Sequence, residues 1–364
     1  MSHMQSVDLQ VPVPVPARDG EGQGWQLAAS VYLPGDDALA HCPPVLVLFP
    51  GGGYNRRYFD LPVPGFSQAA HHASRGTVVV AIDHLGVGES SVPPMEVTTL
   101  AAVATASHSG VTAILEGLRR GTLAPDIRPV DVACVVGAGQ SLGGHALAVM
   151  QADHRTFDGV AMLGSSMTGT APPVRPGQPE MVPPDDATPE EAALFALANT
   201  DWTWVFHWEA ITLADASRRP RDLASLVAAD VADGLPGRRS APPWGSLTYP
   251  GFGAVSMLPG VVAAEAARID VPVLLATGER DVCRPLGEEI AAFGTATDIA
   301  VYVVPRMAHM HNFATTRALL WERLDEFVTH VARMTATNVT HAGPRARDVR
   351  RPDARDRRFG QSAR

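Results

Sequence analysis

Short runs of apolar, largely β-branched residues recur along the chain, separated by stretches with a helical pattern. They lie at residues 45–49, 77–82, 132–136, 159–163, 271–277 and 299–304. A strand that is apolar on both faces has to be covered by helices on both sides, which is typical of parallel sheets. The pattern therefore predicts an α/β fold with a doubly wound, mostly parallel sheet of about eight strands, once two earlier segments are included.

These two earlier segments, residues 7–15 and 26–33, alternate more between polar and apolar residues, as antiparallel edge strands do. Pro12, Pro14 and Pro16 lie in or directly after the first of them. Proline has no N–H to donate to a central ladder, so the first segment is expected at the rim of the sheet.

Two helical stretches are expected to cover the sheet. Residues 100–118 are apolar nearly all round and predict a buried helix. Residues 314–334 predict a closing helix whose apolar face is formed by Leu320, Leu324, Phe327 and Val331. Beyond them, residues 343–364 hold eight arginines and three aspartates without apolar periodicity, which is typical of a disordered segment.

Between residues 164 and 269 the rhythm of strands stops. Thr188, Pro189 and Glu191 form the sequence of a capped helix N-terminus, and an aromatic cluster follows at residues 201–208. A structureless loop of this length is unusual inside a compact domain, so an inserted helical segment is expected. The predicted division is a core of residues 5–164 and 268–334, an inserted cap of residues 165–267 and a disordered basic tail of residues 335–364.

The composition excludes several classes of function. A net charge of −9 argues against a nucleic acid partner, which needs a basic surface. The chain contains no lysine, which removes Schiff-base chemistry and the lysine of a P-loop. Three cysteines without C-x-x-C spacing predict no disulfide framework, and no run approaches the ~18 apolar residues of a membrane span. The first residues also lack the apolar core of a signal peptide, so we expect a cytoplasmic protein. With nucleic acid and membrane partners disfavoured, we expect it to act on a small molecule. The oligomeric state stays open.

The pentapeptide G-Q-S-L-G at residues 139–143 carries the strongest chemical signal. It follows the apolar run 132–136 and precedes the helix-compatible stretch 142–151. In this strand–turn–helix context, G-x-S-x-G predicts a nucleophile elbow, a sharp turn that lifts a serine hydroxyl above the sheet. Ser141 is therefore the candidate nucleophile.

A glycine-rich turn at residues 49–54 (F-P-G-G-G-Y) leaves the first apolar run. Acyl transfer needs backbone N–H donors directed at the oxygen that becomes negatively charged. The amide of Gly52 or Gly53 is predicted to supply one donor, and the amide of Leu142, directly after the nucleophile, the other.

The candidate base and acid follow the last two apolar runs. His309 lies four residues after Pro305 and is the preferred base, with His311 as the alternative. Asp281, in the segment G-E-R-D, is the preferred partner that orients the imidazole, with Glu279 as the alternative. Five other histidines are interpreted as structural: His71, His72, His108, His145 and His330. Of these, His145 lies one helical turn past Ser141 and could instead line the site.

Taken together, these motifs resemble the α/β-hydrolase superfamily. The chain order Ser141, Asp281, His309 matches it, and residues 83–90 resemble the D-x-x-G-x-G-x-S turn that many members carry. The resemblance covers residues 25–165 and 268–334 and implies two-step acyl transfer that requires no metal or organic cofactor. The chain departs from the family in having Pro50 where members often have histidine. The inserted segment resembles no particular subfamily.

We therefore expect a serine hydrolase that cleaves an ester or thioester of a small-to-medium apolar acyl compound. Tyr54, Trp204 and Trp208 are predicted to form an apolar wall of the substrate site, although the aromatic cluster could instead hold the insertion on the core. Which of the tryptophans at positions 202, 204 and 208 faces inward stays open. The alternatives are a carbon–carbon bond hydrolase or acyltransferase with the same three residues, and a non-catalytic ligand-binding member of the fold. Serine at the elbow disfavours epoxide hydrolases and dehalogenases, which need a carboxylate nucleophile there.

Overall fold

The described residues form one twisted sheet of eight strands, ordered β1-β2-β4-β3-β5-β6-β7-β8. The computed structural model describes residues 5–14, 24–209, 221–253 and 255–342. The strands are β1 (Gln5–Val13), β2 (Trp25–Leu33), β3 (Val45–Phe49), β4 (Val78–Ile82), β5 (Val135–Gln140), β6 (Gly159–Leu163), β7 (Val273–Gly278) and β8 (Ile299–Val304). The pairs β1–β2 and β2–β4 are antiparallel, and the remaining pairs are parallel. The predicted fold class is confirmed, with β1 at the rim.

The largest shift from a predicted strand is in β5. The apolar run 132–136 predicted a strand that ends before the elbow, but β5 begins only at Val135 and continues through Gly137 and Gly139 to Gln140. Glycine has a low strand propensity, which is why the pattern seemed to stop. In the sheet these positions pair with β3, where Gly139 is opposite Phe49. The elbow therefore begins directly at the end of the strand.

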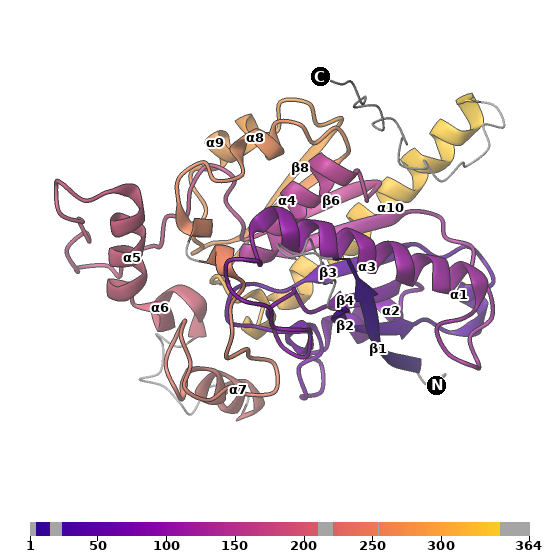
Figure 1. Cartoon of the computed structure of the whole chain (residues 1–364), viewed down its shortest axis with the longest axis horizontal. Helices are drawn as coiled ribbons and strands as arrows, with labels where there is room; N and C mark the ends of the chain where they lie inside the picture. Colours follow the sequence, from indigo (N-terminus) through magenta and orange to yellow (C-terminus); the bar gives the residue numbers. More distant parts are fainter. Residues whose placement is uncertain (1–4, 15–23, 210–220, 254, 343–364) are drawn as a thin grey trace, which may run out of the picture.

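Helices cover both faces of the sheet (Figure 1). On one face, α3 (Leu100–Arg120) and α4 (Leu142–His154) enclose one apolar core, with α8 (Ala263–Ala266) against α4. On the other face, α2 (Gln68–Ala73) and α10 (Arg317–Ala342) enclose a second core. Shorter elements are α1 (Asp36–Leu39), α9 (Leu286–Ala291), η1 (Arg56–Phe59) and η6 (His311–Phe313). None of the described helices is long and apolar enough to cross a bilayer.

The closing helix is longer than expected. Its predicted apolar face, Leu320, Leu324, Phe327 and Val331, is buried as expected. The helix continues to Ala342, so the first eight residues of the predicted tail are helical and that boundary was wrong. The physical reason is that Gly343 and Pro344 are the first helix breakers after Met334. The prediction of disorder for residues 343–364 falls outside the described residues.

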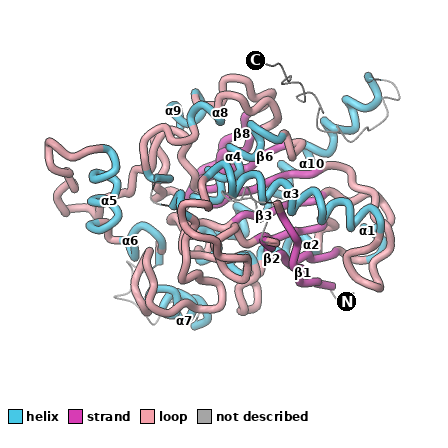
Figure 2. The backbone as a smooth tube through the Cα atoms, in the orientation of Figure 1, coloured by secondary structure: helices cyan, strands magenta, loops and turns pink. Residues whose placement is uncertain are grey.

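The segment between β6 and β7 contains α5 (Pro189–Asn199), α6 (Trp202–Phe206), α7 (Arg221–Val231), η4 (Gly251–Gly253) and η5 (Val255–Met257). The predicted capping box is present at the start of α5, where Thr188 and Glu191 each accept the other's backbone N–H. In Figure 1, α5, α6 and α7 lie together to one side of the sheet, and Figure 2 shows that loops make up much of this segment. This segment, called the inserted segment below, lies beside the three layers of helices, sheet and helices.

Candidate active site

Ser141 occupies a strained turn between β5 and α4. Its φ of 52° and ψ of −120° lie in a region that residues with a side chain rarely adopt. The backbone N–H of Ser141 donates to Leu163 O at 2.9 Å, which holds the turn against β6. A Cβ at Gly143 would lie 2.4 Å from Phe49 O, so only glycine lets α4 approach β3 this closely. The local sequence thus dictates the raised position of the Ser141 hydroxyl at the end of β5.

The structure brings Ser141, His309 and Asp281 into one row of hydrogen bonds. The Ser141 hydroxyl donates to His309 Nε2 over 2.9 Å, and His309 Nδ1 donates to Asp281 Oδ1 over 2.6 Å. The side chains of His309 and Asp281 are only 3% exposed, so bulk water does not compete for the hydrogen bond between them. This is the geometry that a serine nucleophile, a general base and an orienting carboxylate require.

Asp281 is held as an anion by its donors. Burial alone would raise its pKa, but the His309 imidazole and hydrogen bonds from His309 and His311 hold it well below its usual range. The N–H groups of Gly278 and Val282 also donate to the carboxylate, each at 2.8 Å. The orientation of Asp281 toward His309 is thus fixed by contacts on both of its oxygens.

The two alternatives for base and acid lie elsewhere. His311 Nε2 donates to the second oxygen of Asp281 at 2.9 Å and has no contact with Ser141. Glu279 accepts the N–H of Arg306 at 2.7 Å, in the turn that leads away from β8. The preferred residues His309 and Asp281, rather than their alternatives, therefore lie next to Ser141.

The glycine-rich turn lies against the elbow. Gly52 and Leu142 both line the cavity in front of Ser141, whereas Gly53 lies behind and its carbonyl accepts the N–H of Ser246. Leu142 is the first residue of α4, so its N–H has no acceptor within the helix. A Cβ at Gly51 would meet Gln140 Oε1 at 2.0 Å, so a larger residue there would displace the Gln140 side chain. Of the two glycines proposed from the sequence, Gly52 has the better position.

His84 fixes the start of this turn. Its Nε2 donates to Pro50 O at 3.0 Å, and its ring is stacked on Phe49. Burial lowers the pKa of His84 to about 4, so the ring is neutral near pH 7. His84, two residues after the end of β4, thus supports the turn that begins at Pro50.

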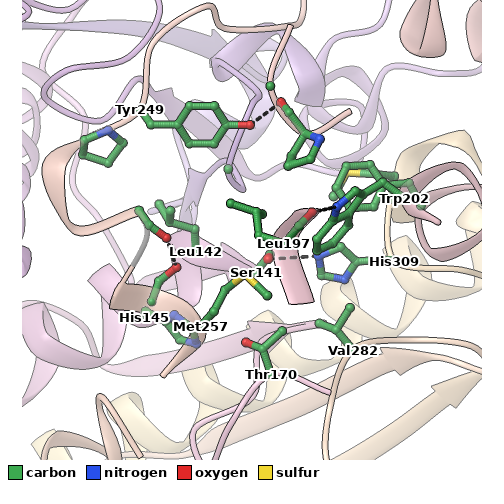
Figure 3. A pocket seen from close by; sticks show the side chains of 18 of the residues that line it. Ser141, Leu142, His145, Thr170, Leu197, Trp202, Tyr249, Met257, Val282 and His309 are labelled. Atoms are coloured by element: carbon green, nitrogen blue, oxygen red, sulfur yellow. Dashed lines mark hydrogen bonds between the residues drawn. The ribbon is translucent and has the colours of Figure 1, made fainter. Parts of the chain in front are cut away.

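A cavity of about 290 Å³ opens over Ser141 and His309. Figure 3 shows Trp202 beside His309 on one side, and Tyr249 and Leu142 on the opposite side. Among the described residues that line it, none is Asp, Glu or Arg. Most of the wall is apolar, formed by Met95, Leu142, Leu197, Trp202, Phe206, Pro236, Tyr249, Pro250, Met257, Val282 and Met310. The cavity suits an uncharged, mainly apolar group.

Tyr54 does not line this cavity. It is 1% exposed, and its hydroxyl donates to Asp230 Oδ2 at 2.6 Å, so it joins the glycine-rich turn to the inserted segment. The predicted place of Tyr54 in the substrate wall was wrong, because a buried tyrosine hydroxyl needs a hydrogen-bond partner and finds it in α7.

Trp204 and Trp208 do not line it either. The Arg280 guanidinium lies over both rings, 3.8 Å from the centre of Trp204 and 4.7 Å from that of Trp208. The wall is formed instead by Trp202 and Phe206. Residues four apart share a face of a helix, and Trp204 lies on the opposite face of α6. Asp201 caps this helix by accepting the N–H of Trp204. This N-cap fixes where the helix begins, and it is the sequence signal that could have shown which tryptophans share a face.

Two further histidine groups are relevant to chemistry. His145 lines the cavity, and its Nε2 donates to Ser166 O at 2.8 Å; burial lowers its pKa to about 4. His71, His72 and Asp325 have donor atoms within 4.8 Å of one another, a spacing that could hold a metal ion. However, both imidazoles already donate to Asp325, so the hydrogen-bonding groups of this cluster are paired with one another. These bonds connect α2 to α10, outside the cavity.

Comparison with known proteins agrees with this architecture. The model of the alpha/beta hydrolase family matches residues 46–320. A comparison with curated proteins found no significant match.

Similar solved structures include a thermophilic esterase from Thermogutta terrifontis, with 18% identity, 89% of this chain and 99% of the other covered, and a TM-score of 0.55. An esterase from Exiguobacterium antarcticum has 16% identity, covers 88% of this chain and 100% of its own, and has a TM-score of 0.54. The epoxide hydrolase CorEH has 16% identity, covers 89% of this chain and 99% of its own, and has a TM-score of 0.51. At these identities the likeness concerns the fold alone. The family match spans most of the chain, and the chain therefore belongs to the alpha/beta hydrolase family.

Proposed function

We propose that the protein is a serine hydrolase that cleaves an ester or thioester of a small-to-medium apolar acyl compound. The observation that carries this proposal is the row Asp281–His309–Ser141, which ends on the cavity with bonds of 2.6 and 2.9 Å. Likeness to solved esterases does not decide the reaction, because an epoxide hydrolase shares the fold. The elbow residue does bear on it, since Ser141 rather than a carboxylate occupies that position.

The mechanism follows from the contacts. His309 takes the proton of the Ser141 hydroxyl as the oxygen attacks the acyl carbonyl, and Asp281 stabilises the imidazolium that forms. The amides of Leu142 and Gly52 stabilise the negative charge that develops on the carbonyl oxygen. His309 then protonates the leaving alcohol or thiol, and an acyl-enzyme remains on Ser141. Water, activated by the same imidazole, releases the acid and restores the hydroxyl.

The wall of the cavity supports the proposed substrate class. A charged group would lose its hydration there without meeting a side chain of opposite charge. The volume of about 290 Å³ suits an acyl group of modest size, in contact with Trp202 and Phe206. The three residues also serve carbon–carbon bond hydrolases and acyltransferases, but no contact in the cavity favours those reactions over ester cleavage.

The test is labelling with a fluorophosphonate probe, followed by turnover of p-nitrophenyl esters and acyl thioesters of increasing chain length. We expect wild-type protein to be labelled and to hydrolyse short and medium uncharged esters, and Ser141→Ala to do neither. A wild-type protein that is folded but neither labelled nor active on any ester or thioester would refute the proposal. Selective cleavage of carbon–carbon substrates would replace it by the second reaction type.

A further inference from the structure

Asp230, near the end of α7, is a buried carboxylate outside the row of Ser141, His309 and Asp281. Its two oxygens accept four side-chain hydrogen bonds: Tyr54 Oη at 2.6 Å, His207 Nε2 at 2.9 Å, Arg238 Nη2 at 2.9 Å and Trp244 Nε1 at 2.8 Å. The residue is 0% exposed. A buried carboxylate is costly unless every oxygen is paired, so this group imposes a definite position on all of its donors.

Two of these donors belong to the support of the glycine-rich turn. Tyr54 directly follows Gly53 in the chain. The backbone here is also paired with the segment that carries Trp244, since Asn55 N donates to Trp244 O at 3.0 Å and Ser246 N donates to Gly53 O at 2.9 Å. The position of the Gly52 amide therefore depends on how this segment is held.

A third donor belongs to the support of His309. His207 ends α6, and the two preceding carbonyls accept backbone N–H groups of the base loop: Val205 O from His309 N and Phe206 O from Met310 N, each at 3.0 Å. The loop that carries the base is thus bonded to the residues just before His207. Through Tyr54 and His207, Asp230 contacts the supports of both loops.

We propose that Asp230 is a positioning residue that sets the oxyanion amide of Gly52 relative to His309, although it touches neither substrate nor the reacting atoms. This inference rests on the proposed function. The inserted segment then has a part in the rate of the reaction as well as in substrate choice. The simpler reading, in which Asp230 only anchors the insertion, gives a different result in the following test.

The test compares an ester with its thionoester, in which sulfur replaces the carbonyl oxygen. Sulfur is larger and accepts hydrogen bonds weakly, so the ratio of kcat on the two substrates reports the fit of the oxyanion amides. Tyr54→Phe removes only the hydroxyl that binds Asp230, and Asp230→Asn removes the charge. The matched control is Tyr32→Phe, which also removes a tyrosine hydroxyl from a carboxylate, that of Asp60 at 3.0 Å.

We expect Tyr54→Phe and Asp230→Asn to lower kcat on the ester by about fivefold to tenfold, the effect of displacing rather than deleting a donor, with KM changed less than twofold. The ester-to-thionoester ratio should fall with kcat, and Tyr32→Phe should leave both unchanged. If Asp230→Asn fails to fold, Tyr54→Phe decides alone.

Three results would overturn the inference: both variants within twofold of wild type, a lower kcat at an unchanged ratio, or an equal effect of Tyr32→Phe. Labelling of wild type by the fluorophosphonate probe separates the two proposals. An unlabelled, inactive wild type removes the proposed function and this inference together, whereas a labelled wild type with normal variants removes the inference alone.

Discussion

The sheet and the inserted segment contribute to the site in different ways. The sheet supplies Ser141 after β5, Asp281 after β7 and His309 after β8. The insertion supplies no member of this row, yet it contacts the loop of each one, as Val205 O does for the His309 N–H. In the proposed mechanism the chemistry depends on residues at strand ends, whereas we propose that the precision of the site depends on a region with few regular elements. Substitutions in the two regions should therefore differ in which kinetic or stability parameter they change as well as in the size of the change.

The largest effect is expected in the sheet region, at the elbow. Ser141→Ala removes the proposed nucleophile and should lower kcat by more than about 10³-fold. Alanine is smaller than serine, so the substitution should leave the fold intact. The measurement is steady-state hydrolysis of a p-nitrophenyl ester, with thermal unfolding of both proteins as the control. Residual activity above about 1% of wild type would show that another group performs the attack.

The base loop should show a sharp difference between two neighbouring histidines. His309→Ala should lose as much activity as Ser141→Ala, because members of such a row act as a unit. His311→Ala should lose only about tenfold, since it removes one of four donors to Asp281 and leaves the His309 bond in place. Parallel kcat measurements on the two variants provide the check. A reversed order would mean that His311 is the base.

Two carboxylates allow a matched comparison of the regions: Asp230 in the insertion and Asp325 in α10. Burial raises the pKa of both, but hydrogen bonds from His207 to Asp230, and from His71 and His72 to Asp325, outweigh it and hold each pKa at about 2. Asp325→Asn should therefore destabilise the fold without changing kcat by more than about twofold, whereas Asp230→Asn should also lower kcat.

The low pKa of these carboxylates also predicts how their contribution to the stability of the fold changes with pH. A folded-state pKa below the ordinary 3.8 means that the ionised carboxylate stabilises the fold above about pH 4, and that this contribution is lost as the pH falls toward 2. The difference in Tm between wild type and Asp325→Asn should hence be full at pH 7 and shrink between pH 4 and 2. A difference that stays constant over this range would contradict the assigned charge state.

The smallest effect is expected in the wall of the cavity. Trp202→Ala or Phe206→Ala removes an aromatic face worth roughly 1–2 kcal/mol of apolar contact, and should lower kcat/KM severalfold for medium-chain esters and little for acetate esters. Trp204→Ala, on the opposite face of α6, is the control and should leave chain-length selectivity unchanged while lowering Tm. If Trp204→Ala changes the selectivity and Trp202→Ala does not, the assigned face of α6 is wrong.

The sequence predicted the two regions unequally, for a physical reason. Strands buried on both faces leave a continuous apolar signal, and the residues after them meet at one edge of the sheet. For this reason the sequence alone points to Ser141, Asp281 and His309. Even there, Gly137 and Gly139 hid the true end of β5, because glycine has a low strand propensity.

In the insertion the decisive contacts are long-range and polar. Nothing in the local pattern indicates that Tyr54 meets Asp230, 176 residues further along the chain. The helix α6 is short, and moving its predicted start by one or two residues exchanges the faces of Trp202 and Trp204. The sequence therefore indicates an aromatic cluster but not the direction in which each ring points. The Arg280 contact of Trp204 and Trp208 became visible only with the fold.

The most direct test of the central claim is to locate the covalent adduct. Wild-type protein treated with a fluorophosphonate would be digested and its peptides analysed by mass spectrometry. We expect a single modified residue, Ser141, and no adduct on Ser141→Ala. Modification of another cavity residue such as Ser256 in wild type, or full labelling of Ser141→Ala, would contradict the assignment of Ser141 as the nucleophile.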